Sequence, residues 1–367
     1  MKKRIILIII LLLIIIAVVV SVGNNKKSPS EKIEVGVLMP FTTNFAWWGD
    51  AIRNSIKIAQ IDGYAKNFEF VYQDTKCDPK EAVSATQSML ALHPSMKFFI
   101  VGCDSDLKAM SSLLNEKKDL GFMVGLSGSD LYETRFPIIN LAYRLETEAN
   151  TAAKFASEKL GVKKLGIITD NGNFGGVLAD SATKYMQSVG GVAVSERIKY
   201  NEADPSTSIL KILQSNPDAI YMQNDIPALS TMLKRLSQMG YVGKRIVYYG
   251  GRDQSLIDTA GAVAEGVYVP WAISEASSTQ RESFEKEFKM TFGKEPFITA
   301  YFMYDGILML DKASEECGDD ARCIENYFYK TNNFIGTLGN VKYQPNGQVE
   351  RNFYLQQIKN GKFVDVK

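Results

Sequence analysis

Short apolar runs rich in β-branched residues alternate with amphipathic segments along most of this 367-residue chain. The first run, residues 33–38, predicts a strand that is buried on both faces of a parallel sheet. The segment after it places Ile52, Ile56 and Ala59 on one face, which is typical of a helix. Residues 41–49 form the loop between them. This loop follows the carboxyl end of the strand, where open α/β sheets bind their ligands.

The same alternation continues in two series. The first series predicts strands and helices at residues 68–73, 79–92, 97–102, 105–117, 121–126, 138–142 and 147–160. The second predicts strands at residues 164–169, 192–200, 219–223 and 245–249, with helices that end near 189, begin at 204 and cover 226–239. Repetition of strand and helix in this order predicts two α/β units, each built on a largely parallel sheet.

The start of the helix at residue 79 carries a specific signal. Asp78 is a good N-cap, Pro79 suits the first helical position, and Glu81 completes the pattern of a capping box.

The last hundred residues no longer follow the strand-helix alternation. The pattern predicts a strand at 266–269, helices at 279–292, 299–315 and 321–330, and strands at 340–343 and 353–358. A turn at Pro345-Asn-Gly347 separates the last two strands.

The N-terminus has the pattern of a membrane-directed segment. Residues 5–22 form an apolar run, interrupted only by Ser21, behind three basic residues. As a helix this run spans roughly 27 Å, close to the ~30 Å hydrocarbon core of a bilayer. We therefore predict that residues 1–22 are an uncleaved transmembrane anchor, that 23–32 are a flexible tether, and that the rest is extracytoplasmic. The alternative is cleavage after Gly23, which gives a secreted or periplasmic protein.

Length and charge limit the classes of function. The length favours two domains. Forty-two basic residues balance 41 acidic ones, and no basic cluster follows the N-terminus, so we expect no nucleic-acid partner.

The four cysteines suit an oxidising compartment. Cys77 follows the second predicted strand and Cys103 the third, so neighbouring strand ends can bring them within disulfide reach. Cys317 and Cys323 flank a polar loop between two predicted helices and can close it. Because the chain has one histidine and widely spaced thiols, we expect no metal site.

Two adjacent tryptophans, Trp47 and Trp48, lie in the loop after the first strand. We interpret them as walls of a ligand cleft. Burial of one or both in the core is an equally good interpretation, because large aromatic side chains are usually buried.

An ordered series of motifs resembles the type I periplasmic binding proteins, in the leucine/isoleucine/valine-binding branch that serves ABC importers. The segments are IEVGVLMPFT, WWGD, YQDTKCDPKEAV, FIVGC, LSGSD, KLGIITDNGNFGG, NPDAIYMQ, AEGVYV, FGKEPFITAYFMYDGILML and FIGTLGNVKYQPNGQ. Together they cover nearly all of residues 33–363. No single motif is specific, but their order is.

The resemblance implies an α/β fold of two Rossmann-like lobes, joined by hinge strands, that close on a small ligand. Lobe 1 is expected at residues 33–144 and 270–350, and lobe 2 at 145–269 and 351–367. An ABC permease is the expected partner, and no cofactor or catalytic residue is expected. The resemblance also implies a disulfide between Cys77 and Cys103.

Carried over by position, the implied ligand contacts are Trp48, Asp104, Ser105, Ser127, Gly128, Ser129, Phe174, Asp225, Arg252 and Asp253. The chain departs from the family at three of them. Asp104 stands where a small hydroxyl residue is usual, and Trp48 and Phe174 stand where a tyrosine is common.

These residue types can bind the two charged groups of an amino acid. Ser127, Ser129 and the amides after Cys103 can donate to the carboxylate, and Asp225 or Asp253 can accept from the ammonium. Ser129→Ala and Asp253→Ala are then each expected to weaken binding by about 1 kcal/mol or more. The alternatives are structural: Ser105 and Ser129 as helix caps, the two aspartates as solvated loop carboxylates, and Phe174 as a hydrophobic plug. Arg252 can bind the ligand carboxylate or a neighbouring acid.

Two other classes of function share features with this chain. A Rossmann-type enzyme is disfavoured, because Gly172, Gly175 and Gly176 do not form G-x-G-x-x-G and the only histidine, His93, precedes Pro94 at a helix end. A ligand-sensing ectodomain that acts through a membrane partner remains as the alternative to a transporter subunit. Branched-chain amino acids are the expected ligands.

Overall fold

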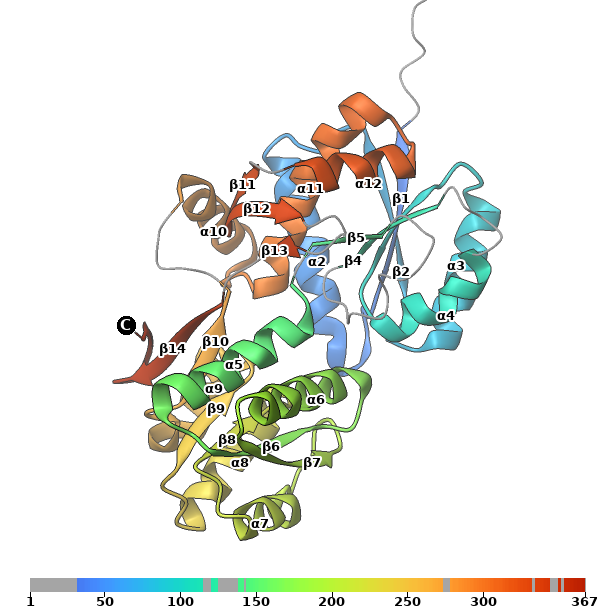
Figure 1. Ribbon diagram of the computed structural model, residues 1–367. Coiled ribbons are helices and arrows are strands. Elements are labelled where there is room, and N and C mark those ends of the chain that lie inside the picture. Colours follow the sequence, from blue (N-terminus) through green and yellow to red (C-terminus); the bar gives the residue numbers. More distant parts are fainter. Residues whose placement is uncertain are drawn as a thin grey trace, which may run out of the picture.

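The computed structural model describes residues 32–114, 120–124, 138–141, 143–272, 278–331, 334–343, 349–350 and 353–366 (Figure 1). Five parallel strands form a first sheet in the order β2-β1-β3-β4-β5. Their bounds are Ile33–Met39 (β1), Phe68–Asp74 (β2), Phe98–Val101 (β3), Gly121–Val124 (β4) and Ile138–Asn140 (β5). The register places Val35 of β1 beside both Phe70 and Phe98.

The second sheet is mixed, in the order β15-β14-β10-β9-β8-β6-β7. Its strands are Lys164–Asp170 (β6), Val192–Ile198 (β7), Ala219–Met222 (β8), Lys244–Val247 (β9), Tyr268–Trp271 (β10), Tyr354–Lys359 (β14) and Lys362–Asp365 (β15). The pairs β10 with β14 and β14 with β15 are antiparallel, and the other pairs are parallel. The end of the chain therefore returns to this sheet.

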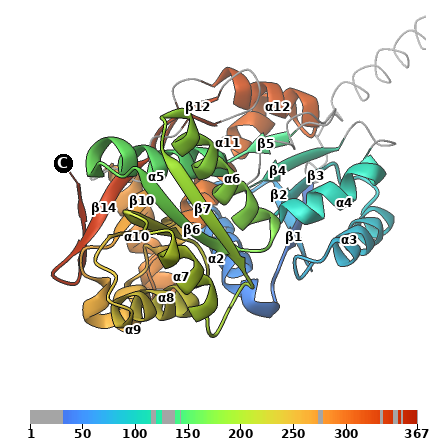
Figure 2. The same ribbon diagram turned by 60° about the horizontal axis from the view of Figure 1, so that its bottom comes forward.

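Helices cover both faces of each sheet (Figure 2). Beside the first sheet lie Ala46–Ile61 (α2), Pro79–Leu92 (α3), Asp104–Leu114 (α4), Ile298–Cys317 (α11) and Ala321–Lys330 (α12), and Thr279–Phe292 (α10) contacts α2. Beside the second lie Leu145–Leu160 (α5), Asn173–Ser188 (α6), Ser206–Gln214 (α7), Ile226–Gln238 (α8) and Gln254–Ala260 (α9). Three short strands, Phe334–Gly336 (β11), Gly339–Tyr343 (β12) and Val349–Glu350 (β13), form a small antiparallel sheet.

One hydrophobic core spans the two large sheets. It joins Val35 and Ile52 on the side of the first sheet to Leu165 and Tyr221 in the second. Separate clusters fill the outer faces, between β3 and the helices α3 and α4, and between β8 and the helices α7, α8 and α9. The two halves of the molecule therefore pack against each other on a continuous apolar layer.

The predicted βα order is found, and the differences are local. The helix expected at 105–117 begins at Asp104 and is described as far as Leu114, and the strand expected at 266–269 begins at Tyr268. The hydrophobic pattern did not predict three short strands, β11, β13 and β15, or the two-turn helix α9. Segments this short have too few residues to display a period.

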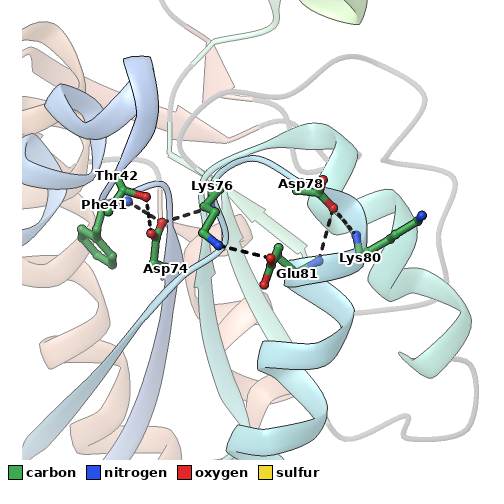
Figure 3. A network of polar contacts seen from close by, with 7 residues as sticks. All are labelled: Phe41, Thr42, Asp74, Lys76, Asp78, Lys80 and Glu81. Carbon is green, nitrogen blue, oxygen red and sulfur yellow. Dashed lines mark hydrogen bonds and ion pairs between the residues drawn. The ribbon is translucent and has the colours of Figure 1, made fainter.

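The capping box predicted at α3 is half formed. Asp78 accepts hydrogen bonds from the backbone N–H groups of Lys80 and Glu81, at 2.8 and 3.3 Å. The Glu81 carboxylate does not reach back to the cap, because it pairs with Lys76 Nζ at 3.2 Å (Figure 3). The backbone N–H of Asp78 donates instead to the carbonyl of Thr75.

Within residues 32–366 as described, no helix is long and apolar enough to cross a membrane. The predicted anchor at residues 1–22 lies outside the described residues.

Candidate functional site

Two adjoining cavities lie where strands of both large sheets end. The first, which we call the aromatic cavity, has a volume of about 350 Å³. Seven aromatic side chains line it: Phe45, Trp47, Trp48, Phe174, Tyr200, Tyr248 and Tyr249. Polar groups come from Ser105, Asp170, Asn171, Asn173, Gln223 and Thr299. A volume of this size suits a small organic ligand.

The loop predicted at residues 41–49 is shorter than expected, because a 3-10 helix at Thr43–Phe45 and then α2, from Ala46, take up most of it. Phe45 therefore reaches the cavity from the 3-10 helix, and Trp47 and Trp48 reach it from the first turn of α2. Asp74 at the end of β2 holds the remaining loop in place (Figure 3). Asp74 accepts hydrogen bonds from Phe41 N (2.8 Å), Thr42 Oγ1 (2.5 Å) and Lys76 N (3.0 Å). Partial burial raises the pKa of Asp74, but these hydrogen bonds outweigh it and bring the pKa below its usual value. The carboxylate therefore stays ionised and fixes the loop at neutral pH.

Gly49 brings the first turn of α2 close to the strand before it. A Cβ atom at this position would lie 2.3 Å from the carbonyl oxygen of Pro40. Only glycine allows this approach, which sets the position of Trp47 and Trp48 just before it. The rings of Trp47 and Trp48 are stacked, with centroids 6.4 Å apart.

Two polar atoms of residues in the cavity wall lack a hydrogen-bond partner among the described residues. They are Trp48 Nε1 and Thr299 Oγ1, and both are buried. Such groups are uncommon in folded proteins, since each costs roughly 1–3 kcal/mol.

The carboxyl end of β6 supplies the one charged residue of the aromatic cavity, Asp170. Its Oδ1 accepts from Gly172 N at 2.6 Å, and Arg197 donates to the carbonyl oxygens of Asp170 and Gly172 at 2.6 Å each. Gly175 allows α6 to approach, because a Cβ there would lie 2.3 Å from the Asp170 carbonyl. The loop from Asp170 to Phe174 is thus rigidly placed at the start of a helix.

Gln223 directly follows β8 and joins this loop to the next strand. Its Oε1 accepts from the backbone N–H of Asp170 at 2.9 Å. Because this bond requires the amide oxygen, the Nε2 group is the part left for other contacts. Gln223 lines the aromatic cavity, so it offers a hydrogen-bond donor there.

A buried carboxyl group lies behind the wall formed by Tyr249. Glu148, in the first turn of α5, is fully buried and accepts from the hydroxyl of Tyr221 at 2.8 Å. Burial raises the pKa of Glu148 to about 8, against the opposing hydrogen bonds from Tyr221 and the Tyr249 backbone. Tyr143 and Tyr249 pack edge to face beside it, with centroids 5.6 Å apart.

The second cavity, which we call the polar cavity, has a volume of about 890 Å³. It shares Trp47, Tyr200 and Tyr248 with the aromatic cavity. Its other walls include the charged residues Asp225, Arg252, Asp253, Lys294, Glu295 and Lys362. The two cavities therefore adjoin along these three side chains.

The two aspartates of the polar cavity cap helices. Asp225 accepts from Ala228 N at 3.0 Å at the start of α8, and Asp253 accepts from Ser255 N at 2.8 Å at the start of α9. Burial raises the pKa of Asp225, and the bond from Ala228 opposes this. These bonds occupy one oxygen of each carboxylate, so a structural role accounts for both residues.

The predicted contact residues divide between the cavities. Trp48, Ser105 and Phe174 line the aromatic cavity, whereas Asp225, Arg252 and Asp253 line the polar one. Ser105 does not cap α4, since the helix already begins at Asp104. Ser127, Gly128, Ser129 and the side chain of Asp104 lie outside the described residues.

Sequence reasoning missed several wall residues of the aromatic cavity, chiefly Asp170, Tyr200, Gln223, Tyr248 and Tyr249. A signal for them was present, because each lies at the carboxyl end of a predicted strand or within two residues of it. That position is where ligands bind in sheets of this type.

Both predicted disulfides are present in the structure. Cys77 is joined to Cys103 and Cys317 to Cys323, with Cα atoms 5.6 and 5.5 Å apart. The first pair lines the aromatic cavity. Among the residues described, no group of histidine, cysteine or acidic side chains has the arrangement of a metal site.

Residues 32–362 match the family model described as periplasmic binding protein. The chain belongs to the periplasmic binding protein family. The resemblance inferred from the ordered motifs is confirmed at this level. A curated member, the leucine-specific-binding protein of Salmonella typhimurium, is 25% identical over 250 residues, which are 65% of this chain and 67% of that one.

Solved structures of periplasmic binding proteins share the fold. A leucine-binding protein from Thermotoga maritima superposes with a TM-score of 0.81 at 22% identity, over 91% of this chain and 98% of that one. An ABC transporter solute-binding protein from R. palustris in complex with benzoate superposes with a TM-score of 0.79 at 19% identity, over 91% of this chain and 95% of that one. The predicted fold, with α/β units on two large sheets, is therefore confirmed.

Proposed function

We propose that this periplasmic binding protein is the extracytoplasmic solute-binding subunit of an ABC importer and captures a small amino acid-like ligand. The observation that carries this proposal is the aromatic cavity between the two large sheets, with Asp170 as its single charged residue. The names of relatives support the class of ligand, because one binds leucine and a structural neighbour binds benzoate. We propose no catalytic role.

An amino acid can meet complementary groups in this cavity. Asp170 keeps Oδ2 available for an ammonium group, since the bond from Gly172 uses Oδ1. The N-terminus of α6 is capped by Gly172 without a side-chain hydrogen bond, so its first amides and its dipole favour a carboxylate. An apolar side chain can then pack on the aromatic walls. This proposal places the ammonium on Asp170, whereas the sequence favoured Asp225 or Asp253.

We infer that binding closes two lobes, made of residues 33–144 with 270–350 and of 145–269 with 351–367. The ligand would contact residues of both, for example Trp48 from one and Phe174 from the other. Contacts made only in the closed form favour that form. Residues 1–22 would anchor the protein to the membrane, and 23–32 would let it reach an ABC permease.

A thermal-shift screen of the full-length protein in detergent tests the binding role. We expect an aliphatic or aromatic amino acid to raise the melting temperature by mass action, and calorimetry to give one site per chain. A panel of free amino acids and benzoates in which no compound shifts the melting temperature contradicts the proposal. Co-purification with a permease and its ATPase supports an importer, whereas co-purification with a kinase or chemoreceptor favours the sensing alternative.

A further inference from the structure

Arg252 lines the polar cavity, and its guanidinium is held on one edge only. Its Nε donates to Gln356 Oε1 at 2.7 Å, and Gln356 donates in turn to Asp365 at 2.7 Å. The guanidinium lies over Trp271, with Cζ 4.4 Å from that ring centroid and 5.4 Å from the ring centroid of Phe363. No other hydrogen bond or ion pair joins the guanidinium to the described residues, so both Nη groups keep their donors. An arginine fixed in this way can bind the two oxygens of one oxyanion.

The charge of Arg252 is only partly compensated by its surroundings. Burial lowers the pKa of Arg252, because the guanidinium has lost much of its hydration. Nearby Tyr301, Asp365 and Glu285 oppose this shift, but the pKa stays below its ordinary value. Both carboxylates already have partners, since Asp365 accepts from Gln356 and Glu285 accepts from the hydroxyl of Tyr301. An anion on the Nη groups would supply the compensation that these acids do not.

The walls of the polar cavity favour an organic anion with a single charge. Three basic residues on the walls are balanced by three acidic ones, which together are Arg252, Lys294, Lys362, Asp225, Asp253 and Glu295. The two aspartates cap helices and Glu295 pairs with Lys289, so these acids stay in place and would repel an anion of higher charge, such as a phosphate dianion. Tryptophan and phenylalanine side chains on the same walls can pack on an apolar group, namely Trp47, Trp271, Phe288, Phe297 and Phe363.

The anion site is separate from the aromatic cavity. Asp170 ends β6, whereas the Arg252 guanidinium lies over Trp271, which ends β10. The strands β8 and β9 lie between β6 and β10, so the two positions are three strand spacings apart, or about 14 Å. The ammonium and the carboxylate of one amino acid are too close together to reach both. The negative charge of Asp170 also disfavours, in the aromatic cavity, a carboxylate that carries no ammonium.

We propose that the polar cavity is a second ligand site, which binds an organic monocarboxylate through the Nη groups of Arg252. The carboxylate accepts from the guanidinium, and the apolar part of the ligand packs on the aromatic walls. Those walls come from both halves of the molecule, for example Phe297 just before α11 and Trp271 at the end of β10. This inference goes beyond the proposed solute-binding role, because it assigns a ligand to a cavity that the amino acid does not occupy.

Calorimetry on the full-length protein in detergent tests the second site with three probes: phenylalanine, 3-phenylpropanoate, which is phenylalanine without its ammonium, and the uncharged 3-phenylpropanamide. We expect 3-phenylpropanoate to bind at one site per chain, with the same affinity when the protein is saturated with phenylalanine. The amide should bind at least tenfold more weakly than the acid, because it carries no charge for Arg252.

Variants separate the two cavities. Arg252→Gln should lower the affinity for 3-phenylpropanoate at least tenfold and leave the affinity for phenylalanine unchanged, and Asp170→Asn should weaken only phenylalanine. Arg245→Gln is the matched control and should change neither affinity. Arg245 is a partly buried arginine that bonds the carbonyls of Val263 and Glu265 and lines neither cavity.

Each outcome decides the question. The second site is overturned, with the solute-binding role intact, if 3-phenylpropanoate does not bind, if phenylalanine displaces it, or if the amide binds as tightly. It is also overturned if Arg252→Gln leaves the affinity for 3-phenylpropanoate unchanged or lowers both affinities together. If Arg252→Gln does not fold, the amide comparison and the competition experiment on the unmodified protein decide. If phenylalanine does not bind, the amide comparison and Arg252→Gln decide the second site, and the wider panel described above judges the solute-binding role.

Discussion

The ring of Phe45 lies against the ring of Tyr200, with centroids 5.0 Å apart and planes inclined by 33°. Phe45 ends the short 3-10 helix η1 (Thr43–Phe45) that follows β1 of the first sheet, and Tyr200 follows β7 of the second sheet. Both side chains line the aromatic cavity. The contact therefore joins the two halves of the molecule at the wall of the ligand cavity.

Removing the Tyr200 ring should make bound ligand leave faster. Phe45 and Tyr200 touch at the wall of the aromatic cavity, so Tyr200→Ala deletes a ring contact worth about 0.5–1.5 kcal/mol, which we propose helps to hold the lobes closed on the ligand. We expect a several-fold faster dissociation rate, measured by stopped-flow fluorescence of Trp47 and Trp48. Tyr200→Phe keeps the ring and should behave like the unmodified protein. An unchanged rate in Tyr200→Ala would show that this contact does not hold the cleft closed.

Neutralising Asp170 should weaken amino acid binding. Asp170→Asn removes the charge that we assign to the ligand ammonium, and the loss of a charged partner costs about 1.5–3 kcal/mol, or roughly tenfold or more in affinity. Asp253→Asn is the comparison, because this side chain caps α9 and lines only the polar cavity. If calorimetry finds that Asp253→Asn loses more affinity than Asp170→Asn, Asp253 binds the ligand ammonium, as the sequence suggested.

Glu148 should make the protein less stable as the pH rises. The folded state holds the proton up to a pKa of about 8, whereas an unfolded glutamate loses it near ~4.3. The folded state thus binds more protons between these values, so the free energy of unfolding falls as the pH rises through that range. Glu148→Gln should abolish the fall and be more stable at pH 8 by about 1 kcal/mol or more. Urea denaturation at pH 5 and pH 8 measures this, and equal pH dependence in both proteins would contradict it.

The two disulfides should differ in their effects. Replacing Cys77 and Cys103 by serine should lower the free energy of unfolding by about 2–4 kcal/mol and weaken ligand binding, since both residues line the aromatic cavity. The pair Cys317 and Cys323 encloses a much shorter segment, 6 residues against 26, and lies outside both cavities. Its removal should cost less stability and leave affinity unchanged. Denaturation and calorimetry on the two double variants separate these effects.

The sequence by itself determined the local elements and their order. Short, nearly continuous apolar runs predicted β1, β6 and β8, and capping residues predicted the start of α3. These signals could be read because each depends only on neighbouring positions in the chain. The position of Trp48 after the first strand indicated a ligand contact, and the family resemblance added Ser105 and Phe174; all three line the aromatic cavity. The ordered motifs were enough to indicate the family.

Only the tertiary structure decided which strand ends face each other. Phe45 meets Tyr200, and Gln223 orients Asp170, through contacts between segments far apart in the chain. It also showed that Asp225 and Asp253 cap helices in one cavity while Asp170 stands in the other. The physical reason is that a cavity depends on how the two sheets pack across a shared core. No periodicity within a single segment encodes that arrangement.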